Sequence, residues 1–205
     1  FENIQYEAQQ SLTKPANEQI GWITGSQVCY CAEAFQGVPR EHPDAPALSV
    51  LATVLRNGFL HTAIREKGGA YGAGATNDTS TNTFKFFSYR DPKCAETFSA
   101  FRDSIEWSKT SISEQHLEEA ILGVVSSIDK PLSPVGEAKN DFNFNLEDIS
   151  TEERLEMRQK VMNCSIEDLI RVSQNYLTKD SKKSILAGEA YREEAISLGL
   201  NLREV

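Results

Sequence analysis

The residues best placed to do chemistry stand in one short stretch, Arg65-Glu66-Lys67-Gly68-Gly69-Ala70-Tyr71. A tight turn could hold the guanidinium and the phenol close together, and both groups could donate hydrogen bonds to a peptide carbonyl or to an oxyanion developing on it. The small residues that follow, from Gly72 to Ala75, would let an extended peptide approach and pair with the chain. The stretch therefore indicates a peptide-binding site with Arg65 and Tyr71 as donors.

The same stretch also has a purely structural interpretation, as the end of a helix. Arg65 and Lys67 would complement the helix dipole, and Gly68 would supply the left-handed cap. Tyr71 would then be an aromatic residue of the next strand. Composition alone favours this second interpretation, and the residues by themselves leave both open.

The three histidines do not form a zinc-binding motif. A zinc helix needs two histidines four residues apart with a glutamate between them. His116 starts an H-x-x-E sequence, but the fifth position is Ala120, and His42 and His61 stand far from it. We therefore expect no metal to be bound by this chain, and His116 to be a solvent-facing residue in the first turn of a helix.

The four cysteines are too sparse for a disulfide scaffold. Cys29 and Cys31 are two apart in an expected strand, which places both thiols on one face. Cys94 and Cys164 stand alone, and no C-x-x-C pair is present. We interpret all four as small buried residues or free thiols.

Composition excludes several classes of protein. Hydrophobic residues make up 40% of the 205 residues and charged residues 25%, which is ordinary for a globular domain. The formal net charge of -9 would repel a phosphate backbone, so we expect no nucleic-acid partner. No stretch approaches the roughly 18 apolar residues of a membrane helix, so we expect no membrane partner, and no signal peptide is visible.

Hydrophobic periodicity and capping signals place the elements that must position these residues. They predict strands over 27–35, 70–77, 83–89 and 183–189, and helices over 44–66, from 91 onward, 113–128, within 133–146, after the capping boxes at 150 and 165, and over 191–198. Regular alternation of strand and helix is absent. The pattern indicates an α+β fold, a two-layer sandwich with an antiparallel or mixed sheet and helices on one face. Residues 1–18 form a lead-in segment and 19–205 one domain.

Several spaced motifs resemble one known family. The run from Leu60 to Gly72 closely resembles the C-terminal half of the insulinase/pitrilysin family of zinc metallopeptidases, in particular its presequence protease and falcilysin branch. Further agreeing segments, in the same order, are 27–28, 42–44, 88–92, 106–107 and 129–136. The resemblance covers about residues 26–190.

This resemblance implies a protein of four related α+β domains that close around a peptide chamber. The first domain carries the zinc motif H-x-x-E-H, and the last is metal-free and contributes an arginine and a tyrosine. By motif these are Arg65 and Tyr71, which would contact the substrate together with Gly68 and Gly69 and stabilise the tetrahedral intermediate. The helix over 44–66 has only His61, with Asn57 and Arg65 at the positions four residues away.

The chain is therefore expected to be the inactive fourth domain of a zinc endopeptidase that degrades unstructured peptides. Its start at Phe1 fits an excised domain. Its expected partners are the zinc-bearing N-terminal half of the same protein and peptide substrates, for which the net negative charge would favour basic sequences. Relatives occur in mitochondria, other organelles and bacteria. Two alternatives of the same fold remain: a non-catalytic scaffold and a free-standing peptide-binding module.

Overall fold

The computed structural model describes residues 18–178 and 180–205, so the predicted lead-in segment lies, apart from Glu18, outside the described residues. The strands are β1 Ile20–Thr24, β2 Cys29–Gln36, β3 Gly72–Asp78, β4 Thr83–Asp91, β5 Ser181–Gly188 and β6 Asn201–Glu204. The helices are α1 Ala45–Leu55, η1 Arg56–Glu66, α2 Ala95–Ser108, α3 Glu114–Ile128, α4 Pro134–Leu146, α5 Thr151–Met162, α6 Ile166–Tyr176, η2 Glu189–Tyr191 and α7 Arg192–Ser197.

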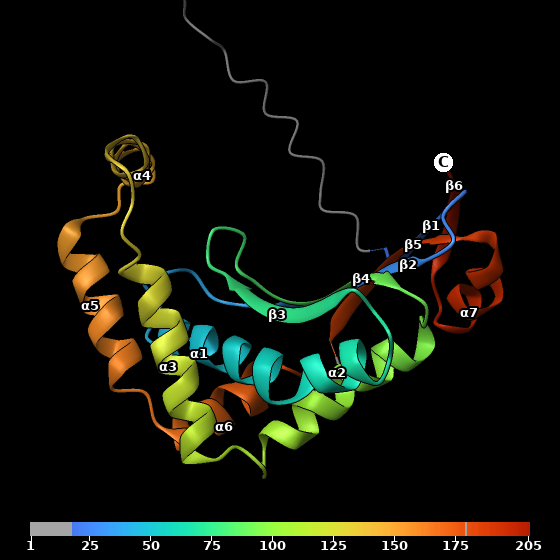
Figure 1. The fold of residues 1–205 in the computed structure, drawn as a ribbon, viewed down its shortest axis with the longest axis horizontal. Coiled ribbons are helices and arrows are strands. Elements are labelled where there is room, and N and C mark those ends of the chain that lie inside the picture. The colour runs from blue at the N-terminus through green and yellow to red at the C-terminus, as the bar shows by residue number, and fades with distance from the viewer. Residues whose placement is uncertain (1–17, 179) are drawn as a thin grey trace, which may run out of the picture.

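One mixed sheet organises these elements, with strand order β3-β4-β2-β5-β1-β6. The pairs from β3 to β5 are antiparallel, whereas β1 runs parallel to both of its neighbours. Helices α1 and α2 lie along one face of the sheet, and α3 and α5 lie beyond α1 (Figure 1). The α+β sandwich with helices on one face is therefore confirmed, and β3 forms a free edge of the sheet within the described residues.

The core lies between the sheet and these helices. The strand β2 alternates in burial, with Cys29, Cys31, Glu33 and Phe35 facing inward, as the period of two predicted. Phenylalanines dominate the packing: the Phe86 ring, for example, lies 5.3 Å from that of Phe101. Their large apolar area accounts for much of the stability of this layer.

The sequence pattern did not predict two of the strands. β1, with the sequence IGWIT, and β6, with NLRE, are short and form the far edge of the sheet. Their sequences alternate too briefly to stand out, and pairing with β5 and with each other holds them in place. The strand predicted over 183–189 is thus an interior strand, rather than the last one.

The predicted helix over 44–66 forms, but it changes character halfway. It is α-helical to Leu55 and then widens into the π-helical η1, in which hydrogen bonds span five residues, as from the Lys67 amide to the Thr62 carbonyl. Asp44 occupies the N-cap position, yet its carboxylate does not cap the helix. It accepts hydrogen bonds from Tyr176 (2.7 Å) and pairs with Arg171 (2.7 Å), which ties α1 to α6. Burial and this contact raise the pKa of Tyr176 to about 12.

The continuous helix Ala45–Glu66 is, by length and composition, apolar enough to cross a membrane, with a mean hydropathy of 1.2. The sequence did not predict this property, because polar residues interrupt the apolar run. Half of that window is buried inside the domain. The helix is therefore the central core helix of the fold, and its apolar character reflects contacts with the sheet and with α2, α3, α5 and α6.

A buried carboxylate joins three elements. Glu33 of β2 is fully buried, and it accepts hydrogen bonds from Arg102 of α2 and from the Ser181 hydroxyl of β5 (2.5 Å). Arg102 also lies over the Phe35 ring, 5.3 Å from its centre. Since a buried carboxylate is costly without a partner, this ion pair fixes α2 against the middle of the sheet.

Arg102→Met is expected to lower the free energy of unfolding by about 3 kcal/mol, because it leaves the Glu33 charge buried and unpaired. Lys109→Met, which removes an ion pair at the end of the same helix, should change it by less than about 1 kcal/mol. Urea unfolding of the 205-residue chain measures both. Equal losses in the two variants would contradict this account of Glu33.

Candidate functional site

The predicted site residues lie together in one turn between η1 and β3. The Gly69 amide donates to the Arg65 carbonyl (3.0 Å) and the Ala70 amide to the Ile64 carbonyl (3.1 Å), which closes the helix end. Gly69, and not Gly68 as predicted, adopts the left-handed conformation, with φ of +88°. Gly68 is required for space, since a Cβ there would lie 2.4 Å from the Ile64 carbonyl oxygen.

Tyr71 stands at the surface where this turn enters β3, with 61% of its side chain exposed. Its ring packs against that of Tyr89 at 5.4 Å, and the Arg90 guanidinium lies 5.9 Å from its centre. The Tyr71 amide donates to the Arg90 carbonyl (3.3 Å). Tyr71 is therefore held by its ring and backbone, while its hydroxyl points to no hydrogen-bond acceptor in the described part of the chain.

A β-bulge brings Tyr89 and Arg90 to Tyr71. Between the pairs Cys29–Asp91 and Cys31–Ser88, β2 contributes Tyr30 alone, whereas β4 contributes two residues. Arg90 takes a positive φ of 50° there, an uncommon conformation for a residue with a side chain. The sequence analysis did not select Tyr89 or Arg90, although both lie in a segment that carried the family resemblance.

Arg65 lies in the last turn of η1 and is exposed. Within residues 18–178 and 180–205, no hydrogen bond or ion pair holds its guanidinium, whereas the neighbouring Glu66 lies 3.3 Å from the His61 imidazole. The structure thus brings Arg65, Gly68, Gly69 and Tyr71 to one turn without a direct bond between the two donors. Both donor groups remain available to a ligand.

The glycines of β3 accommodate aromatic rings from β4. Gly72 pairs with Tyr89 and Gly74 with Phe87. A Cβ at Gly72 would lie 2.3 Å from the Tyr89 ring, and one at Gly74 would lie 3.1 Å from the Phe87 ring. The small residues that suggested room for a peptide backbone therefore first make room for these rings, which shape the surface beside Tyr71.

The Tyr89 ring belongs to a larger apolar surface on the sheet face opposite the helices. We call it the aromatic row; it consists of Trp22, Tyr30, Tyr71, Tyr89 and Leu186. Strand register aligns it, because Tyr30 pairs with Leu186 and Leu186 with Trp22. Tyr30, Tyr89 and Leu186 are each about 40% exposed. No helix of residues 18–178 or 180–205 lies on this face (Figure 1), so the described part of the chain leaves the aromatic row uncovered. Exposed apolar surfaces of this kind often bind partners.

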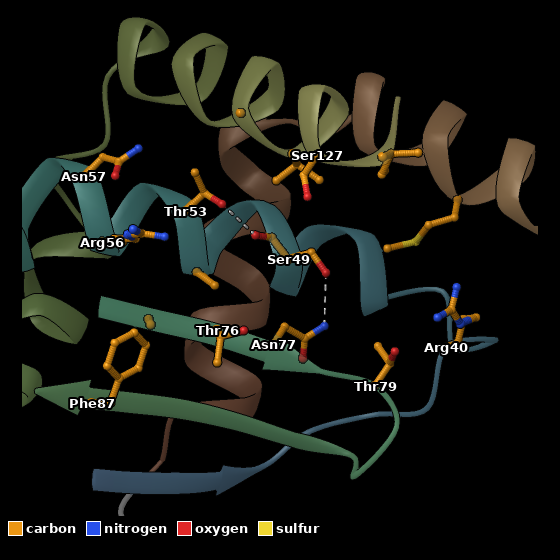
Figure 2. A pocket seen from close by; sticks show the side chains of 16 residues that line it. Arg40, Ser49, Thr53, Arg56, Asn57, Thr76, Asn77, Thr79, Phe87 and Ser127 are labelled. Carbon is orange, nitrogen blue, oxygen red and sulfur yellow. Dashed lines mark hydrogen bonds between the residues drawn. The ribbon is translucent and has the colours of Figure 1, made fainter. Parts of the chain in front are cut away.

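A groove of about 980 Å³ runs beside the free edge of β3, between this strand and the helices α1, α3 and α5. Figure 2 shows Thr53 of α1 and Arg56 of η1 facing it from one side and Thr76 of β3 from the other. Asn77 donates to the Ser49 hydroxyl (3.2 Å) and joins the two walls at its base. The free edge offers backbone groups to which an extended peptide could add as a further strand.

The charge of this groove differs from that of the whole chain. Arg40 and Arg56 line it, and no carboxylate is among its lining residues in the described chain. The net charge of -9 therefore gives no local attraction for basic peptides in this groove. The lining combines polar side chains such as Thr53 and Thr76 with apolar ones such as Val124 and Phe87.

The described residues do not fit a catalytic zinc site of the histidine type. His61 is half-exposed in η1 and has only Glu66 beside it, and His116 lies against the Trp107 ring at 5.2 Å. The His116 amide donates to the Ser113 hydroxyl, and its ring accepts a hydrogen bond from the Ser113 amide, which caps α3. The residue is half-buried, rather than solvent-facing as predicted. His42 accepts a hydrogen bond from the Asp44 amide (3.1 Å), which leaves the three imidazoles in separate places.

Solved protease and peptidase domains share this fold. A protease from Helicobacter pylori superposes with a TM-score of 0.71 at 18% identity, covering 84% of this chain and 45% of that one. The peptidase M16 inactive domain from Pseudomonas fluorescens superposes with a TM-score of 0.66 at 20% identity, covering 83% and 43%. Both share the fold of the chain described above.

Sequence comparison narrows this class to one family. The model of the PreP C-terminal domain matches residues 27–187. The mitochondrial presequence protease of Xenopus laevis is 36% identical over 184 residues, and that of Eremothecium gossypii is 39% identical over 157. The chain belongs to the PreP C-terminal domain family, as the resemblance predicted. In that match the aligned region covers 89% of this chain but only 17% of the Xenopus protein.

Gly72→Ala is expected to lower the free energy of unfolding by about 1–3 kcal/mol, because the new methyl group must displace the Tyr89 ring. It should also loosen Tyr71, which rests on that ring. Gly25→Ala is the matched control, since a Cβ there meets nothing within 4 Å. Thermal unfolding of both variants tests this, and an undiminished stability of Gly72→Ala would show that Tyr89 does not need the space.

Proposed function

We propose that this chain is the C-terminal domain of a zinc endopeptidase that degrades unstructured peptides, and that it does not carry the catalytic zinc. In this proposal Arg65 and Tyr71 bind the substrate backbone near the bond that is cleaved. The observation that carries it is the exposed Arg65–Tyr71 turn at the border of an uncovered aromatic surface, in a chain of the PreP C-terminal domain family.

The residues of this turn would act by hydrogen bonding. A guanidinium and a phenol both donate, and a donor aimed at a developing oxyanion stabilises the transition state more than the substrate. Arg65 would orient the peptide carbonyl, and Tyr71 would donate to the oxygen as it gains negative charge. The rigid ring packing on Tyr89 supports this role, because a donor that is already positioned costs no reorganisation.

The zinc would be held elsewhere in the parent protein and would supply an activated water. The separate histidines of this chain support that division, and so does the small share of the presequence proteases that the chain spans. By itself, this chain would bind peptides without cleaving them.

The partner in this proposal is the remaining, N-terminal part of the same protein. The helix α4 has no buried residue, and it stands away from the sheet (Figure 1). Val135, Phe142 and Leu146 on it are 66–79% exposed, and Leu155 of α5 is 61% exposed. Apolar side chains that are this exposed on a helix are typical of a surface that another domain covers.

Arg65→Gln in the full-length protein is expected to lower kcat/KM for peptide hydrolysis about 100-fold, as loss of one oxyanion donor does. The melting temperature should stay unchanged, because Arg65 is exposed. Arg192→Gln, on the surface of α7, is the matched control and should retain activity. An unchanged kcat/KM in Arg65→Gln would favour the scaffold function. Peptide cleavage by the 205-residue chain alone would contradict the proposal that the catalytic zinc lies in another part of the parent protein.

A further inference from the structure

Three cysteines that are distant in sequence meet in the core. Cys29 and Cys31 face inward from β2, and Cys94 stands at the N-cap position of α2. Each is at most 2% exposed, and their three sulfur atoms lie within 4.8 Å of one another. The fourth thiol, Cys164, is partly buried and lies outside this group. We call Cys29, Cys31 and Cys94 the thiol cluster.

The thiol cluster has nearly the dimensions of a metal site. A zinc ion binds thiolate sulfur at about 2.3 Å, so three sulfurs around one ion lie about 3.8–4.0 Å apart. The sulfurs of Cys29 and Cys31 are 3.8 Å apart. With the third sulfur within 4.8 Å of both, sub-ångström movements of the side chains would place all three around one ion.

We propose that the thiol cluster binds one soft divalent metal ion of the zinc class at a structural site. The sequence analysis expected no metal here because it looked for pairs of cysteines in one segment. Cys94 reaches the other two only through the pairing of β2 with β4 and the turn into α2. Thiolate ligands select soft ions such as zinc over magnesium or calcium.

The surroundings favour a divalent ion. Three thiolates with a divalent ion leave one net negative charge to bury, whereas a monovalent ion would leave two. The N-terminus of the 14-residue α2 faces this charge with its positive dipole end.

Backbone oxygens complete the surroundings of the thiol cluster. The Cys29 sulfur lies 3.1 Å from the Asp91 carbonyl oxygen and 3.4 Å from that of Lys93. Either carbonyl could supply a fourth ligand, as structural zinc sites require four. The Asp91 carboxylate itself is engaged by the Lys93 amide and the Thr97 hydroxyl, so it is not counted as a ligand.

The segment that covers the thiol cluster could open to admit an ion. The Tyr191 hydroxyl donates to the Pro92 carbonyl (3.2 Å) and more weakly to the Gln27 carbonyl (3.5 Å), so it bridges the two loops beside the cluster. Glu194 of the short helix α7 caps the Ala95 amide (3.1 Å). These few polar contacts at the surface are weaker than the core packing below them.

The test uses the 205-residue chain, reduced and freed of metal, titrated with Cd²⁺ as a spectroscopic substitute for zinc. We expect one ion per chain and the ultraviolet sulfur-to-cadmium charge-transfer absorption of three thiolates. Cys94→Ala should weaken binding more than about 100-fold, since loss of a ligand exceeds the effect of an outer contact. Cys164→Ser is the matched control and should bind like the unaltered chain.

A second measurement does not depend on whether a core variant folds. Bound Cd²⁺ or Zn²⁺ should raise the melting temperature of the unaltered chain and of Cys164→Ser alike, and protect three of the four thiols from alkylation. Absence of a charge-transfer band in the unaltered chain would overturn the proposal. So would binding that survives Cys94→Ala in a folded protein, or binding that Cys164→Ser abolishes.

Discussion

The arrangement of the site depends on one steric constraint at the end of the central helix. Gly68 sits where any side chain would collide with the Ile64 carbonyl, and Gly69 turns the chain through a left-handed conformation. This turn ends η1, reverses the chain and starts β3 at the free edge of the sheet. Arg65 and Tyr71 flank the turn, so the same constraint that stops the helix also presents both donors at the surface.

The one-sided packing of the sheet explains why this surface is available. The helices bury the inner face, where phenylalanines and the thiol cluster lie, and the aromatic row stays open on the other face. A peptide that pairs with the free edge of β3 would pass Tyr71 and enter the groove beside α1. The chain spans about a sixth of the presequence proteases that it matches.

Much of this architecture was predictable from local pattern. Alternation in β2 placed Cys29 and Cys31 on one face, and both capping boxes, at Ser150 and Ser165, formed as predicted. The rest depended on tertiary contacts that no local pattern records. Two adjacent glycines do not reveal which one turns left-handed, and a helical period does not reveal the widening into η1. The meeting of Cys94 with β2, and of Tyr89 with Tyr71, arises only when distant strands pair.

The central claim is that the Tyr71 hydroxyl acts on the substrate and does not hold the fold together. Tyr71→Phe in the full-length protein removes that hydroxyl and keeps the ring that packs on Tyr89. We predict that kcat falls about 100-fold while the melting temperature of the protein is unchanged. A kcat equal to that of the unaltered enzyme, with the fold intact, would contradict the claim.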